Sequence, residues 1–179
     1  MGIVARDKGN FVPAPAGTHA AVCVDVEDLG QVKITYADNT TEKHMVYIHW
    51  QIDEINDEGY PFRVRKRYNL SLHDKASLRK DLEAWRGRAF TAEERKAFDL
   101  ETLIGVPAMV SVVHNPGRTG GMFANVQAIM RLAKGMRAPD PDPAYVRICK
   151  REKTQSVAVG DGPRDEDAPP PPYDDEVPF

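Results

Sequence analysis

The sequence predicts a mainly β fold: a five-stranded barrel with a helical insert between its third and fourth strands. Three observations predict it. Apolar residues recur with period two in five stretches, turn-forming residues separate these stretches, and a helical period appears only after the third stretch. The expected order of elements is therefore three strands, a helical segment and two strands.

The first strand is expected over residues 18–36. Small apolar residues alternate with their neighbours along its first half, and we expect this set to face the core: Ala20, Val22, Val24 and Val26. The alternation resumes after Gly30, which interrupts it. A single long strand with a bulge or kink at this glycine is therefore expected.

A turn over residues 37–40 precedes the second strand, expected over residues 45–55. Its core side is Val46, Ile48, Trp50 and Ile52, and its opposite side is Tyr47, His49 and Gln51. A hairpin turn over residues 56–59 leads to the third strand, expected over residues 62–72. Three arginines share one side of this strand: Arg63, Arg65 and Arg67.

The helical insert begins after the third strand. Asp74 is expected to cap the first helix, and Gly87 to end it. Leu78, Leu82 and Trp85 form its apolar stripe, so Trp85, like Trp50, is expected in the core. Thr91 and Glu94 form a capping box for a second short helix, and residues 100–104 are expected to add a turn.

The last two strands follow Pro107. Ala108, Val110 and Val112 alternate in the fourth strand, a glycine-rich loop spans residues 115–121, and the fifth strand covers residues 122–130. Five short strands with a helix between the third and fourth follow the order of an OB-fold barrel. Such barrels bind oligonucleotides on the face of strands two and three and on the one-to-two and four-to-five loops.

With 179 residues, of which 41% are apolar, the chain can support one core domain and tails. The expected division is an N-terminal arm over residues 1–17, the barrel domain over 18–134, a proline-rich and basic linker over 135–160, and an acidic tail over 161–179. No apolar run reaches the roughly 18 residues of a membrane span, and the start does not resemble a signal peptide. A cytoplasmic protein without a membrane partner is expected.

Charge is distributed unevenly along the chain. The net charge is −3, but residues 161–179 hold seven acids against Arg164 alone. The first 160 residues carry 23 basic and 20 acidic side chains, so the body is mildly basic. Four consecutive prolines, residues 169–172, favour an extended spacer within the tail.

Neither the cysteines nor the histidines indicate a metal site. Cys23 and Cys149 are far apart in the chain, and both are expected to be small buried hydrophobes. The five histidines have no metal-ligand or triad spacing, and no cofactor is expected. Residues 145–151 alternate apolar and basic side chains, which leaves three alternatives open: an extra strand, a self-association edge that would make a homo-oligomer, or a flap that contacts DNA.

The chain ends in three acids followed by an apolar tip: Asp174, Asp175, Glu176, Val177, Pro178 and Phe179. A partner with an apolar pocket for the ring and a basic rim for the carboxylates could bind such a peptide. This ending resembles the acidic tip of single-stranded DNA-binding proteins of bacteria and bacteriophages. The resemblance implies an OB-type body that coats single-stranded DNA, and a tip that recruits replication, recombination and repair proteins. For a phage-encoded chain, it implies the cytoplasm of the bacterial host.

The candidate DNA-binding residues combine cations with aromatic rings. Arginines neutralise phosphates and rings stack on bases without selecting sequence. The set is Tyr47, His49, Arg63, Arg65, Arg67 and Arg118, with Phe123 weighed evenly between base stacking and core packing, and Lys33, Tyr36 and Lys43 as weaker members. The alternative for the arginine side is an ordinary solvated strand face that guards against edge aggregation.

Enzyme function is not expected. Seven acids could be imagined as a two-metal nuclease site, but they fall at strand ends and turns, where acids occur for local backbone reasons. They are Asp25, Glu27, Asp28, Asp53, Glu54, Asp57 and Glu58. The alternative to DNA binding is an adaptor that uses the barrel only as a scaffold for protein interaction.

Overall fold

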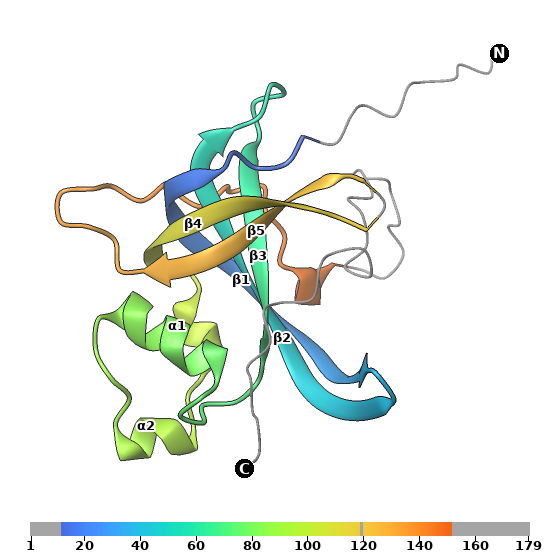
Figure 1. Ribbon diagram of the computed structural model, residues 1–179. Coiled ribbons are helices and arrows are strands. Elements are labelled where there is room, and N and C mark those ends of the chain that lie inside the picture. Colours follow the sequence, from blue (N-terminus) through green and yellow to red (C-terminus); the bar gives the residue numbers. More distant parts are fainter. Residues whose placement is uncertain (1–11, 119, 152–179) are drawn as a thin grey trace.

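The computed structural model describes residues 12–118 and 120–151. This part of the chain is mainly β, as predicted, with one five-stranded antiparallel sheet in the order β3-β2-β1-β4-β5. In Figure 1, β4 and β5 cross in front of β1, β2 and β3. The acidic tail and its tip lie outside the described residues.

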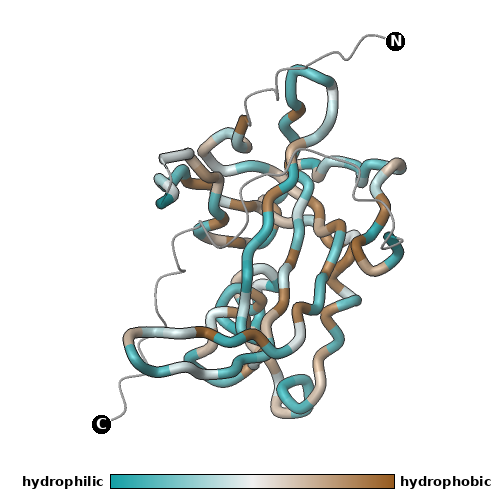
Figure 2. Tube along the Cα trace, turned by 90° about the vertical axis from the view of Figure 1, so that its right-hand side faces the viewer, coloured by the Kyte–Doolittle hydropathy of each residue, from teal (hydrophilic) through white to brown (hydrophobic). Residues whose placement is uncertain are grey.

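The strands are β1 (Gly17–Tyr36), β2 (Asn39–Ile55), β3 (Pro61–Asn69), β4 (Pro107–Pro116) and β5 (Met122–Met130). The sheet keeps two edges, because no ladder joins β3 to β5 among the described residues. One side chain does span the two edges, since Lys66 Nζ in β3 donates to the Gln127 carbonyl in β5 over 3.2 Å. Figure 2 shows hydrophilic and hydrophobic residues alternating along the strands.

The helical insert comprises α1 (Ser77–Arg86), α2 (Ala92–Lys96) and the 3-10 turn η1 (Leu100–Leu103). The Thr91 and Glu94 capping box and the left-handed Gly87 at the end of α1, with φ of 71°, are confirmed. The prediction for Asp74 was wrong. Ala76 occupies the N-cap without a side-chain hydrogen bond, and Asp74 instead forms an ion pair with Arg79.

Two strands differ in length from the prediction. β2 begins at Asn39 rather than near Met45, because its polar first residues pair with the outer half of β1 from Tyr36 back to Gly30. β3 ends at Asn69, where the Leu70 amide still donates to the His44 carbonyl and the chain then turns. Polar hairpin arms lack the apolar alternation from which the boundaries were predicted.

A bulge changes which residues of β1 face the core. Cys23 pairs with Trp50 and Asp25 pairs with His49, so Val24 is an extra residue in the ladder. Before this bulge Ala21 and Cys23 lie in the main core cluster, whereas Val22 is buried outside it. The predicted residues are thus buried up to Val24, but the expectation of a single buried face was wrong for this half of β1, because small apolar residues are buried on both of its faces. The second bulge precedes Gly30, where one was expected.

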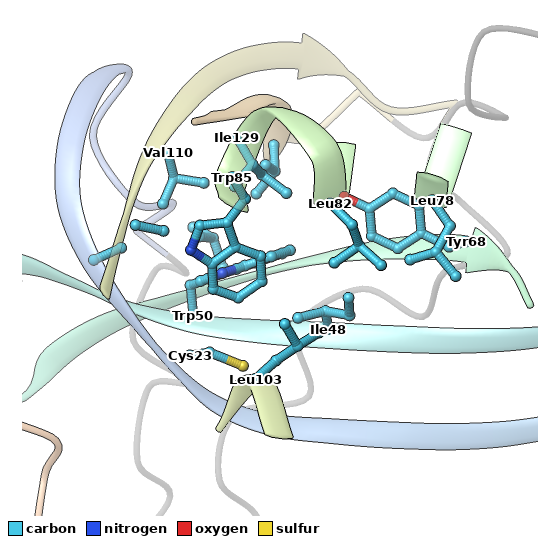
Figure 3. Packing of buried hydrophobic residues seen from close by; sticks show 14 of the residues in the cluster. Cys23, Ile48, Trp50, Tyr68, Leu78, Leu82, Trp85, Leu103, Val110 and Ile129 are labelled. Carbon is cyan, nitrogen blue, oxygen red and sulfur yellow. The ribbon is translucent and has the colours of Figure 1, made fainter. Parts of the chain in front are cut away.

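The core lies between the sheet and α1 (Figure 3). Trp50 from β2 and Trp85 from α1 are in contact, with ring centroids 5.8 Å apart and exposed fractions of 0% and 3%. Trp85 Nε1 donates to the Pro107 carbonyl over 2.8 Å, which joins the helix to the start of β4. Cys23 is buried as expected, but Cys149 is exposed because the segment that carries it runs over the surface.

Candidate nucleic-acid interface

The three arginines of β3 lie on one face of the sheet. In the β2–β3 ladder Tyr47 pairs with Arg67, His49 with Arg65, and Gln51 with Arg63. Val46, Ile48 and Trp50 point to the core from the same strand, so the arginines lie on the opposite side, which we call the outer face. Strand alternation thus brings the cations next to the two aromatic residues predicted with them.

Arg65 covers the ring of Tyr47. The guanidinium carbon lies 4.4 Å from the ring centroid, and Tyr47 is only 6% exposed. Arg65 itself is exposed and Arg67 is half-buried. A guanidinium on a tyrosine ring is attracted by the ring electrons. The ring is therefore presented to a ligand only when Arg65 moves aside.

His49 does not act as a cation on this face. It is 8% exposed, and its Nε2 lies 3.1 Å from the Glu27 carboxylate in β1. Burial lowers the pKa of His49, and Glu27 opposes this only in part. The imidazole is therefore neutral at pH 7. Positive charge on the outer face comes from the arginines.

A segment beyond β5 crosses the outer face (Figure 1, orange). We call residues 137–151 the strap. Gln51 holds it on β2, because its amide donates to the Asp140 carbonyl over 2.8 Å and accepts from the Asp142 amide over 2.9 Å. Arg63 donates to the Asp142 carboxylate over 2.6 Å. The strap therefore occupies one end of the outer face, and Arg63 is already paired.

Asp25 anchors the strap to β1. Its exposed fraction is 0%, and its carboxylate accepts from the Tyr145 hydroxyl at 3.0 Å, Arg147 Nε at 3.1 Å and the Ile148 amide at 2.7 Å. The Val26 amide adds a fourth donor at 2.9 Å. Burial by itself would raise the pKa of Asp25, but the three donors from the strap outweigh it and hold the pKa below its usual range. The anchor is therefore ionised at neutral pH.

The sequence alone did not reveal this anchor. Asp25 had been grouped with acids at strand ends, although it stands at the end of an apolar run, which is the only local signal of burial. Of the three alternatives for residues 145–151, the extra strand is wrong. The segment instead contains a short 3-10 turn, η2 (Ile148–Lys150), and Arg147 also binds Glu101 of η1 at 2.7 Å.

The β1–β2 hairpin carries the weaker candidates. Lys33 faces Glu42 across the hairpin at 3.8 Å, and both side chains are exposed. Tyr36 is 63% exposed next to the turn, where Ala37 adopts a φ of 50°. Lys43 is also exposed. The hairpin projects to the same side of the molecule as the β4–β5 turn in Figure 1.

The two candidate DNA-binding residues at the β4–β5 turn differ in their exposure to solvent. Arg118 is exposed, but Phe123 is only 9% exposed. The Phe123 ring packs on Gly117, where an added Cβ would lie 2.0 Å from a ring carbon. Glycine is therefore required under this ring. Of the two roles weighed for Phe123, packing is the one that its burial matches.

The acids considered for a nuclease site do not form one cluster: of those with a described contact, only Asp53 and Glu54 lie close together, beside His19. Asp25 holds the strap, Glu27 holds His49, and Asp28 bonds to His44 at 2.5 Å. Asp53 and Glu54 lie 3.6 and 4.0 Å from Nδ1 of His19.

Among the described residues, His19, Asp53 and Glu54 form the one group whose ligand atoms could hold a metal ion. His19 Nε2 donates to the Pro15 carbonyl over 2.9 Å, so His19 Nδ1 faces the carboxylates of Asp53 and Glu54. An imidazolium ion pair has the same geometry, and both acids are about half exposed. We therefore assign no metal to it.

No protein-family model matches the chain, and neither does any curated protein sequence. Among the described residues, no helix has both the length and the apolar character needed to cross a membrane. The fold and the outer face define a mainly β protein with a basic, partly covered sheet surface.

Proposed function

We propose that this protein binds single-stranded DNA on an OB-type barrel. The strand order β3-β2-β1-β4-β5 is that of an OB barrel opened between β3 and β5, and the helical insert lies between β3 and β4 as in that fold. The contact of Lys66 with Gln127 across the two edges supports closure. The outer face of β2 and β3, the β1–β2 hairpin and the β4–β5 turn are then the DNA surface.

The single observation that carries the proposal is the arginine row beside Tyr47. Arg63, Arg65 and Arg67 are spaced by two residues on one face, so successive cations lie about 7 Å apart along the strand. This spacing suits the phosphates of an extended single strand. Binding that relies on phosphates is independent of sequence. Movement of Arg65 onto a phosphate would open the Tyr47 ring to a base.

Equilibrium binding of a fluorescent oligo-dT tests the proposal. We expect the full chain to bind it more tightly than duplex of equal length, with log K falling linearly against log salt. Each phosphate contact adds about 0.7 to the slope, so Arg65 and Arg67 alone predict a slope near −1.4, because Arg63 is paired with Asp142. No binding to oligo-dT at low salt would contradict the proposal.

The second candidate is an adaptor with an OB scaffold and no DNA binding of its own. One observation favours it: Tyr47, His49 and Phe123 are all less than 10% exposed, so the rings are not presented directly to solvent. The oligo-dT measurement separates the two functions. A folded protein that binds no DNA at any salt concentration would support the adaptor.

The acidic tail gives a second testable expectation. We propose that residues 174–179 recruit replication, recombination or repair proteins, and that the tail competes with DNA for the basic face in cis. Deletion of residues 161–179 removes a charge of −6, so it should tighten oligo-dT binding severalfold at low salt and little at high salt.

A tail of unchanged length in which the seven acids are replaced by their amides is the matched control. It should bind as tightly as the deletion if charge is the cause. Equal affinity of the full and deleted chains at low salt would rule out the competition.

A further inference from the structure

Two arginines contact the ring of Tyr145 on the strap. The guanidinium carbon of Arg63 is 4.7 Å from the ring centroid, and that of Arg151 is 5.4 Å away. The ring is half-buried, and its hydroxyl is held by Asp25. Burial and the Asp25 carboxylate raise the pKa of Tyr145 to about 12, so the hydroxyl stays protonated and remains a donor. The ring orientation is thus set by the sheet.

Hydrogen bonds to buried groups fix the strap in place. It binds Gln51 through two backbone groups and Asp25 through three donors, and both anchors are at most 3% exposed. Removing the donors from a buried carboxylate is costly, because the charge is left without compensation. The strap is therefore expected to remain docked when a ligand binds beside it.

The charge of the strap indicates whether the strap blocks the DNA surface or forms part of it. A segment that occupies a DNA site in place of DNA should be acidic, as the tail is. The strap instead has four basic and two acidic side chains: Arg137, Arg147, Lys150 and Arg151 against Asp140 and Asp142. Lys150 and Arg151 are exposed at its end. Its net charge attracts a polyanion rather than imitating one.

We propose that the strap is a fixed part of the nucleic-acid surface and that Tyr145 is a stacking site for one unpaired base. Lys150 and Arg151 contact the neighbouring phosphates. Displacement of the Arg151 side chain, whose Nε donates to the Val146 carbonyl over 2.9 Å, exposes the ring, which its hydroxyl keeps in position. This inference rests on the proposed function and adds a second base site to the one proposed at Tyr47.

Oligo-dT binding by full-length variants tests the stacking site. Tyr145→Leu should weaken binding roughly tenfold without changing the salt slope, because it removes a ring and no charge. Tyr145→Phe keeps the ring and should lose much less. Lys150→Ala with Arg151→Ala should flatten the slope by about 1.4. Tyr60→Leu is the matched control, since Tyr60 is 61% exposed in the β2–β3 turn, and it should bind as the unmodified protein does.

A variant that releases the strap without changing its charge tests whether the strap forms part of the DNA surface or blocks it. Ile148→Pro removes the amide that donates to Asp25. If the strap forms part of the DNA surface, this variant should bind oligo-dT more weakly. If the strap blocks the surface, the variant should bind more tightly. Tighter binding by Ile148→Pro, or unchanged binding by Tyr145→Leu, would overturn the inference.

Hydrogen exchange in the DNA-free protein provides a separate readout. The Asp142 amide should be protected in the unmodified chain and should exchange faster in Ile148→Pro, because its bond to Gln51 depends on the docked strap. Rapid exchange in the unmodified chain would refute a fixed strap even if DNA binds. A protected amide without any oligo-dT binding would instead show that the proposed function has failed while the strap is docked; the stacking site would fail with it.

Discussion

Replacement of Arg63, Arg65 and Arg67 by alanine is expected to weaken oligo-dT binding about 100-fold at low salt and to flatten the salt slope by about 1.4. On the proposed function, the variant loses the phosphate contacts of Arg65 and Arg67, and it also loses the Arg63 ion pair with Asp142 that holds the strap. The loss should be the same for all base sequences, because phosphate contacts carry no sequence information. Fluorescence anisotropy with oligo-dT and mixed-sequence oligonucleotides at several salt concentrations measures both quantities.

A variant with the same loss of charge elsewhere is the control. Lys75, Lys80 and Arg95 are exposed residues of the helical insert, whose helix α1 packs on the core side of the sheet and not on the outer face. Their replacement by alanine should change affinity only through net charge and should leave most of the slope intact. If the two triple variants behave alike, general electrostatic attraction is the cause and the arginine row is not the site.

Replacement of Trp85 by alanine is expected to lower the free energy of unfolding by about 3–5 kcal/mol. Trp85 is 3% exposed, packs on Trp50 and donates a hydrogen bond to the Pro107 carbonyl. The variant therefore loses apolar burial, leaves a cavity between α1 and the sheet, and leaves the carbonyl without this donor. Urea denaturation monitored by circular dichroism measures the change.

Two further variants serve as comparisons for the Trp85→Ala measurement. Trp85→Phe keeps most of the packing and should cost clearly less than alanine. Tyr60→Ala alters an exposed ring and should stay within about 0.5 kcal/mol of the unmodified protein. A loss below about 1 kcal/mol for Trp85→Ala would show that the contact between the two tryptophans does not hold the helix on the sheet.

Local patterns predicted the elements well where they carried a strong period. The alternation from Val46 to Ile52 correctly placed Trp50 in the core, and the stripe of Leu78, Leu82 and Trp85 did the same for α1. The side of β3 that carries the arginines was also predicted, because strand geometry puts every second side chain on one face.

Other features escaped prediction because they depend on contacts far apart in the chain. The extra residue Val24 shifts the pairing of β1 with β2, and no residue type at this position predicts such a bulge. Asp74 had the right chemistry for a cap, but its carboxylate pairs with Arg79 while Ala76 takes the capping position. The exposure of Cys149 follows from the path of the strap, which its own residues do not specify.

The sequence by itself determined a mainly β chain, a helical insert after the third strand, and a row of arginines beside Tyr47, because these follow from side-chain periods of two and 3.6 residues. Only the tertiary structure decided what lies against one end of that row, at Arg63. Asp25 and Tyr145 are 120 residues apart, and their hydrogen bond at 3.0 Å exists because the chain returns across the sheet after β5. A buried carboxylate requires donors, and folding brings them from the strap.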